Sequence, residues 1–325
     1  MTRCRGAGRA RLLLLLVVPV LPGRAARGQS AVAADTGRSV RLTGYLQPRF
    51  QDTDDTAAFV LRRARFAVDG RLTPWAALRV QVELHTIGAP AVPSASPLTL
   101  SATDLFVRLD AGRWGGTLGQ FRVPFSLESL LSSTILETTE RSRVVNAAKR
   151  DIGVQIDWRL PGRVRLEGAV VNGDGPNRGG NPDNRMAYFA RAVLTLAPGL
   201  NVGGALEAYP DSSGGDAQVL YQRGRWHMRS EYLTTRHRAS DTRARGWYAL
   251  AAFVVRPPTL QLVGRVEQID PSDKIGTDRL SGYSIGAQYF LRGDDLKVLG
   301  DYELFRGQVM QQRSHREAIQ LQVRF

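Results

Sequence analysis

Basic side chains gather in one stretch of the sequence, residues 125–150, in a pattern that suits anion binding. Its second half carries four of them: Arg141, Arg143, Lys149 and Arg150. Four more arginines stand at positions expected to face them: Arg63, Arg65, Arg79 and Arg122. Planar guanidinium groups match the oxygens of phosphate and similar anions, most effectively where the local dielectric constant is low. Salt bridging is the alternative, because acidic residues lie nearby: Glu128, Glu137, Glu140 and Asp151.

Other residues that could do chemistry lack the context that the chemistry needs. Residues 282–286 read Gly-Tyr-Ser-Ile-Gly, but Ser284 falls inside an alternating segment and not on a strand-to-helix elbow. His315 is the sole histidine after it, and the four histidines show no metal-ligand spacing. Cys4 is the only cysteine. The sequence therefore predicts no enzyme, no cofactor and no metal site.

The N-terminus has the features of an export signal. Leu12 to Leu21 is the only continuous apolar run among 325 residues, and it is too short for the roughly 20 residues of a membrane-spanning helix. Arginines precede it and small residues follow, which predicts a signal peptide over residues 1–28 with cleavage between 28 and 34. Those 28 residues hold six arginines and no acid, so the remainder has 38 basic and 30 acidic residues, a net charge of +8. Positive charge on an exported protein favours an anionic ligand or surface and argues against nucleic acid.

Beyond residue 34 the dominant pattern is strict alternation. Between Ala76 and His85, apolar Leu78 and Val80 alternate with polar Arg79 and Gln81, which is typical of a strand with one apolar face. Sixteen segments show this pattern, near 39–50, 58–69, 76–85, 101–110, 115–124, 151–160, 164–172, 185–196, 202–209, 217–222, 226–237, 246–256, 260–269, 279–291, 296–306 and 319–325.

Many amphipathic strands fit either a soluble sandwich or a membrane barrel, and three features favour the barrel. Segments of about 9–11 residues match tilted membrane strands, and the polar face is heavily charged. Tight turns alternate with longer polar stretches. The chain ends on Phe325, an aromatic that closes an alternating strand and resembles the signal read by the barrel-assembly machinery. Residues 35–325 are therefore predicted to form an all-β, antiparallel transmembrane barrel of about 16 strands, wide enough for an aqueous channel.

Residues 125–150 break the alternation and form the third long loop. Thr134 and Glu137 have capping-box spacing, which predicts a helical turn beginning at Thr134. The loop is also unusually apolar for an exposed segment. We therefore expect it to fold inward from the extracellular side and to narrow the pore.

Several motifs resemble one known family. Residues 119–128 read Gly-Gln-Phe-Arg-Val-Pro-Phe-Ser-Leu-Glu, residues 140–142 Glu-Arg-Ser, and residues 150–154 Arg-Asp-Ile-Gly-Val. With Leu61–Arg65 and Asn172–Gly175, they resemble the phosphate-selective porin O and P family. The resemblance implies a sixteen-stranded, trimeric outer-membrane porin whose inward third loop and basic ladder pass anions, phosphate among them. This chain is short for the family, and its three lysines mean that the ladder is mostly arginine.

The sequence thus predicts a passive anion channel in the outer membrane of a Gram-negative bacterium, with phosphate or a related oxyanion as solute. Its expected partners are inorganic anions, membrane lipid, the barrel-assembly machinery and two further copies of the chain. One alternative is a non-selective porin whose arginines are balanced by Glu83, Asp104, Asp157 and Glu167. A barrel-embedded hydrolase and a structural envelope protein are the remaining alternatives.

Overall fold

The computed structural model of the protein describes residues 38–86, 98–145, 149–308 and 313–325. The predicted signal peptide, residues 1–28, and its cleavage region lie outside these ranges. The described residues contain no helix that is both long and apolar enough to cross a membrane.

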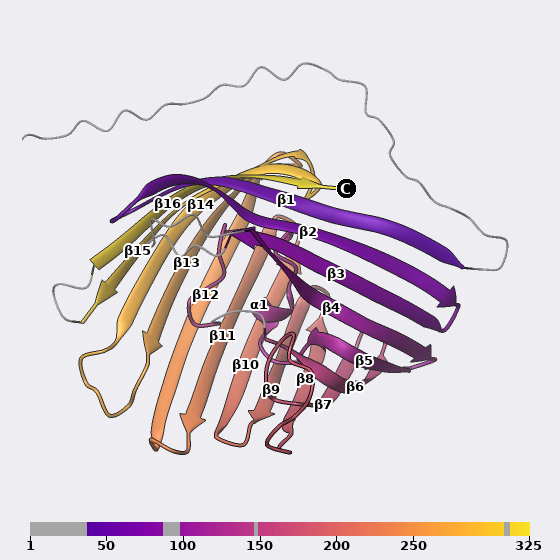
Figure 1. The fold of residues 1–325 in the computed structure, drawn as a ribbon. Helices are drawn as coiled ribbons and strands as arrows, with labels where there is room; N and C mark the ends of the chain where they lie inside the picture. Colours follow the sequence, from indigo (N-terminus) through magenta and orange to yellow (C-terminus); the bar gives the residue numbers. More distant parts are fainter. Residues whose placement is uncertain (1–37, 87–97, 146–148, 309–312) are drawn as a thin grey trace, which may run out of the picture. The chain divides into compact units, whose positions relative to one another are not determined.

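The described residues form sixteen antiparallel strands in a single closed barrel (Figure 1). In chain order the strands are β1 (Ser39–Thr53), β2 (Ala57–Thr73), β3 (Ala76–Thr86), β4 (Leu98–Ala111), β5 (Trp114–Arg122), β6 (Arg150–Leu160), β7 (Val164–Val171), β8 (Ala187–Ala197), β9 (Leu200–Ala208), β10 (Ser212–Arg223), β11 (Trp226–His237), β12 (Thr242–Arg256), β13 (Leu260–Asp270), β14 (Leu280–Arg292), β15 (Leu296–Gly307) and β16 (Arg313–Arg324). Each strand pairs with its sequence neighbours, and β1 pairs with β16. The predicted fold class is confirmed, and each predicted segment corresponds to one strand.

The two ends of the barrel differ in the length of their connections. At one end the turns are short, as in residues 74–75, 112–113 and 161–163. At the other end they range from residues 54–56 to residues 123–149, the longest stretch between two strands. The latter is the third connection at its end of the barrel, as predicted.

The alternation of the sequence appears as two different faces of the sheet. On β6, Ile156 is 55% exposed whereas its neighbour Asp157 is 1% exposed. On β16, Ile319 is 60% exposed and Gln320 is 1% exposed. An apolar outer face and a polar inner face are what a barrel in lipid requires, because hydrocarbon cannot solvate polar groups.

The barrel closes where the first strand meets the last residue. Gly44 and Phe325 exchange two backbone hydrogen bonds, each 3.0 Å from nitrogen to oxygen. A Cβ on Gly44 would come within 2.6 Å of the Phe325 ring, so glycine at this position leaves room for that ring. The exposed Phe325 ring lies beside Phe66, with 6.1 Å between ring centroids. Its role as an assembly signal stays a prediction.

The only helix of the described residues, α1 (Leu127–Leu130), lies in the connection between β5 and β6. The predicted helical turn at Thr134 is wrong, because the helix begins earlier and Ser126 caps it: Ser129 N donates to Ser126 Oγ over 3.3 Å. The polar groups that suggested a capping box have other partners. Glu137 pairs with Arg229 on β11, and the hydroxyl of Thr134 hydrogen-bonds to Ser132 Oγ over 2.9 Å. The carbonyl of Thr134 also accepts from Gln322 on β16 over 3.0 Å. Tertiary contacts have overridden the local signal.

Two glycines pair between β5 and β6, and we expect the one on β5, Gly119, to be required for the stability of the barrel. Gly119 pairs with Gly153, has a φ of 124°, and a Cβ there would lie 2.2 Å from the carbonyl oxygen of Leu105. Gly119→Ala should lower the free energy of unfolding by about 2 kcal/mol or more, because it combines backbone strain with a clash. Thermal unfolding in detergent micelles measures this. Gly116→Ala on the same strand is the matched control, since nothing lies within 4 Å of its Cβ position, and equal losses for both variants would contradict the prediction.

Candidate functional site

Residues 125–145 and Lys149 are held by polar side chains from strands far apart around the barrel. On β1, Tyr45 hydrogen-bonds to Ser133 over 2.6 Å, and on β15, Asp301 accepts from Thr139 N over 2.6 Å. Further contacts come from Arg63 on β2, Glu207 on β9, Arg229 and Glu231 on β11, Arg265 on β13, and Gln322 on β16. The segment therefore lies against the polar face of the sheet.

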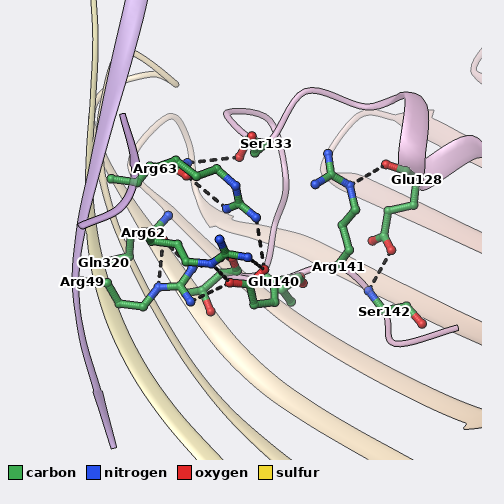
Figure 2. A network of polar contacts seen from close by, with 12 residues as sticks. Arg49, Arg62, Arg63, Glu128, Ser133, Glu140, Arg141, Ser142 and Gln320 are labelled. Atoms are coloured by element: carbon green, nitrogen blue, oxygen red, sulfur yellow. Dashed lines mark hydrogen bonds and ion pairs between the residues drawn. The ribbon is translucent and has the colours of Figure 1, made fainter. Parts of the chain in front are cut away.

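Glu140 is the centre of a group of charged residues in this segment (Figure 2). Its carboxylate accepts from Arg49 at 2.7 Å and from Arg63 at 3.2 Å, and it also pairs with Arg62. Arg49 is anchored further by Gln320 on β16, with its Nε 3.0 Å from the amide oxygen. Burial alone would raise the pKa of Glu140, but Arg63, Arg62 and Arg49 outweigh it and hold that pKa well below its ordinary value. Three cations thus share one carboxylate.

A second charged group fixes α1 to β11. Arg229 is buried and pairs with Glu128 at 2.7 Å and with Glu137. Glu231, also on β11, accepts from the backbone N–H groups of Leu127 and Glu128, the latter over 2.9 Å. These acceptors satisfy donors at the start of the helix that the helix itself leaves free. Sequence analysis missed Arg229, although it occupies an inward position of a predicted strand.

Arg122 and Arg141 differ from the other basic residues because backbone carbonyls hold them. Arg122 NH1 donates to Leu130 O at 3.0 Å and to Leu131 O at 2.8 Å. Arg141 donates through Nε to Glu128 O at 2.9 Å and through NH2 to the same Leu131 O at 2.6 Å. The two donor nitrogens on Leu131 O are therefore no farther apart than those two distances together, 5.4 Å. Figure 2 shows the Arg141 side chain directed toward Glu128 and away from the Glu140 group.

Neither arginine of this pair has an ionic partner. Within the described part of the chain, no carboxylate oxygen lies within 4.0 Å of a nitrogen of Arg122 or Arg141. Burial and then the nearby guanidinium of Arg63 lower the pKa of Arg141 to about 10, so it is still cationic at neutral pH. We call Arg122 and Arg141 the arginine pair. It is a concentration of positive charge that only neutral oxygens hold in place.

The other basic residues singled out from the sequence are mostly ion-paired. Lys149 pairs with Glu207 at 2.6 Å, Arg150 with Asp104 at 2.7 Å, Arg65 with Glu83 at 2.9 Å, Arg79 with Asp69 at 2.8 Å, and Arg63 with Glu140. Arg143 forms no ion pair with another described residue, and its guanidinium lies 3.5 Å from the centre of the Phe305 ring. Salt bridging thus describes five of the eight residues, and the arginine pair and Arg143 are the exceptions.

A cavity of about 220 Å³ opens beside the arginine pair. Side chains of β4 to β7 line it together with Leu130 of α1, and Arg122 is among them. Two further cations in the lining, Arg108 and Arg165, were not among the basic residues singled out from the sequence. Both are paired, Arg108 with Asp157 at 2.8 Å and Arg165 with Glu167 at 2.7 Å. Both arginines occupy inward-facing positions in the alternating pattern of their strands, and this was the signal that could have identified them.

Comparison with known proteins agrees with this architecture. The model of the family described as phosphate-selective porin O and P matches residues 43–227. No curated protein matches the chain. Among solved structures, the anion-selective porin of Comamonas acidovorans is similar, with a TM-score of 0.64 and 12% identity over 89% of this chain and 100% of that one. So is the trimer form of OmpT from Vibrio cholerae, with a TM-score of 0.65 and 10% identity over 89% and 100%. The channel DcaP of Acinetobacter baumannii has a TM-score of 0.64 and 11% identity over 90% and 99%.

Proposed function

Because the chain belongs to the phosphate-selective porin O and P family, we propose that it is an outer-membrane diffusion channel for anions. The observation that carries the proposal is the arginine pair, two adjacent cations with no carboxylate partner among the described residues. Family and fold point to a channel and not to an enzyme. Ser284, the only serine with a nucleophile-like motif, lies within β14 as expected and not at an elbow.

In the proposed mechanism, residues 125–149 narrow the lumen and leave a passage along β4 to β7. An anion reaching the cavity meets Arg122, which lines it, and then Arg141, which shares the carbonyl oxygen of Leu131 with Arg122. Both arginines offer donors that the backbone does not use. These are Nε and NH2 of Arg122 and NH1 of Arg141, which hydrogen-bond to no described residue. They replace part of the hydration of the anion, and the ion-paired cations nearby provide weaker sites to which it can move on. Binding at any one site must stay weak for conduction to continue.

Phosphate is the solute we propose first, on the strength of the family. Two guanidinium groups that share one carbonyl oxygen can each direct hydrogen bonds to different oxygens of one tetrahedral oxyanion. We propose that the other basic residues predicted from the sequence line the rest of the anion pathway: Arg63, Arg65, Arg79, Arg143, Lys149 and Arg150.

Single-channel recording in a planar bilayer tests the proposal. Under a potassium chloride gradient, the reversal potential should show chloride favoured over potassium by about tenfold, the ratio that corresponds to 1.4 kcal/mol. Added phosphate should then reduce the chloride current in a saturable manner, because it occupies the arginine pair. Weak selectivity without phosphate block would instead identify a general porin whose arginines are neutralised by lumenal acids such as Asp104 and Glu167.

We further propose export through the cleaved signal of residues 1–28, recognition of Phe325 by the barrel-assembly machinery, and a homotrimer in the outer membrane of a Gram-negative bacterium. The trimer form of OmpT supports the proposed homotrimer, since OmpT shares the fold of this chain. Size measurement of the detergent-solubilised protein tests the oligomeric state.

A further inference from the structure

The cavity beside the arginine pair has an apolar wall as well as a charged one. Phe106, Phe121 and Leu130 line it together with the cations Arg108, Arg122 and Arg165. Two carboxylates, Asp104 and Glu167, also line it, and they are ion-paired with Arg150 and Arg165. Phe121 is buried in a cluster with Phe125, whereas Phe106 and Leu130 are only partly buried. Two apolar side chains thus stay accessible inside a barrel whose inner face is otherwise mostly polar.

This wall is unsuited to a bare inorganic anion. The face of an aromatic ring carries the negative part of its quadrupole, so it offers no favourable contact to an anion. A strongly hydrated ion such as phosphate also gains nothing from apolar area that it covers. Phe121 is buried in the cluster with Phe125, and Phe106 packs against that cluster while part of its surface lines the cavity.

An organic anion would use both walls at once. Its carboxylate or phosphate group can reach the free donors of Arg122, while an apolar group beside it covers Phe106 and Leu130 and leaves water. The cavity, about 220 Å³, is below the usual range for drug-sized ligands and suits a small molecule.

We propose that this passage prefers small organic anions that carry a ring or short alkyl group next to a single acidic group, over equally charged anions without an apolar part. The inference rests on the proposed anion channel and names the class of solute that its passage favours. Besides inorganic phosphate, the channel would thus take a second class of solutes, which the apolar wall of the cavity selects in addition to their charge.

Block of the chloride current by three probes tests this inference. Benzoate carries both features, acetate carries the charge with little apolar area, and benzamide carries the ring without the charge. Benzoate should half-block the chloride current at a concentration about tenfold lower than acetate, a ratio that burial of part of one ring can supply. Benzamide should not block at the concentration at which benzoate does.

The variant Phe106→Thr should remove most of the difference between benzoate and acetate while it leaves the chloride-to-potassium ratio unchanged. Threonine suits a strand, so β4 should still form. Phe290→Thr is the matched control, since Phe290 is a partly buried phenylalanine on β14, beside Lys297 and outside the cavity lining. This control should keep the preference for benzoate.

The outcomes separate this inference from the proposed function. A channel that is anion-selective but is blocked equally by benzoate and acetate overturns the inference alone. Equal loss of the benzoate preference in Phe106→Thr and Phe290→Thr overturns it as well, because the cavity wall would then not be the cause. A channel without anion selectivity overturns both.

Discussion

Replacing the arginine pair with glutamine, Arg122→Gln together with Arg141→Gln, should lower the chloride-to-potassium permeability ratio by about tenfold or more. The expectation follows from Coulomb's law, since one charge at 5 Å contributes roughly 3 kcal/mol at an effective dielectric constant of 20. Salt in the pore screens part of that energy, and a remaining 1.4 kcal/mol already corresponds to a factor of ten. Glutamine keeps a donor for the carbonyl oxygen of Leu131, so residues 125–149 should stay in place.

The single variants and a control make this result specific. Each single glutamine variant should produce an intermediate loss of selectivity, because the other cation remains. Arg143→Gln should have a smaller effect, since Arg143 is exposed and stacked on Phe305, away from Leu131. Arg225→Gln removes a cation from a short turn between β10 and β11 and should leave selectivity unchanged. If the double variant and Arg225→Gln give the same reversal potential, the arginine pair does not select the ion.

The second large effect is expected at Glu140. Glu140→Gln would leave Arg49, Arg62 and Arg63 without their shared carboxylate, two of them in buried positions. Removing one partner of a buried ion pair costs about 3–5 kcal/mol, because the remaining charge is neither solvated nor paired. Residues 125–149 should then detach from β1 and β2, so both the thermal unfolding midpoint should fall and the single-channel conductance should rise.

Two comparisons define the outcome for Glu140. Glu317→Gln, at an exposed position on β16, should change neither quantity. Adding Arg63→Gln to Glu140→Gln should restore part of the stability, because one uncompensated charge is removed. Unchanged conductance together with lowered stability would show that the segment does not limit ion flow.

The pKa of Glu140 also sets the pH range over which this carboxylate stabilises the segment. Its folded-state pKa lies well below the ordinary value of 4.5, so the stabilisation by Glu140 is fully present above pH 4.5 and is lost only as the pH falls through the lower folded value. The segment should therefore keep its anchor at neutral and mildly acidic pH.

The strands could be predicted from the sequence because their cause is local. Each strand separates lipid from a polar interior, so period two is imposed residue by residue, and segments such as 226–237 were placed at their observed bounds. The agreement was poorer for β10, predicted at 217–222 and observed at Ser212–Arg223. Its first four residues are Ser-Ser-Gly-Gly, which join the sheet through backbone pairing alone and carry no apolar alternation.

The site could be predicted only in outline. The sequence shows which basic residues lie in and near the loop, but it does not show their partners, because these depend on the path of the loop through the barrel. Arg229 and Glu128 are 101 positions apart in the sequence. Likewise, no sequence pattern shows that Arg122 and Arg141 converge on one carbonyl oxygen. The helix was misplaced for the same reason, since Thr134 and Glu137 are engaged by distant strands.

The anchoring of residues 125–149 also bears on the order of events during folding. Ser133 and Thr134 are held by β1, from the start of the chain, and by β16, from its end. Contacts of such long sequence separation form late, because the intervening chain must first be ordered. A nascent barrel that lacks its last strand thus has both an open edge and an unanchored segment. Pairing of the last strand closes the edge and anchors the segment in the same step. In the channel proposed above, the chain would therefore avoid a stage in which the barrel is closed and inserted but not yet narrowed, a stage that would leave the outer membrane permeable.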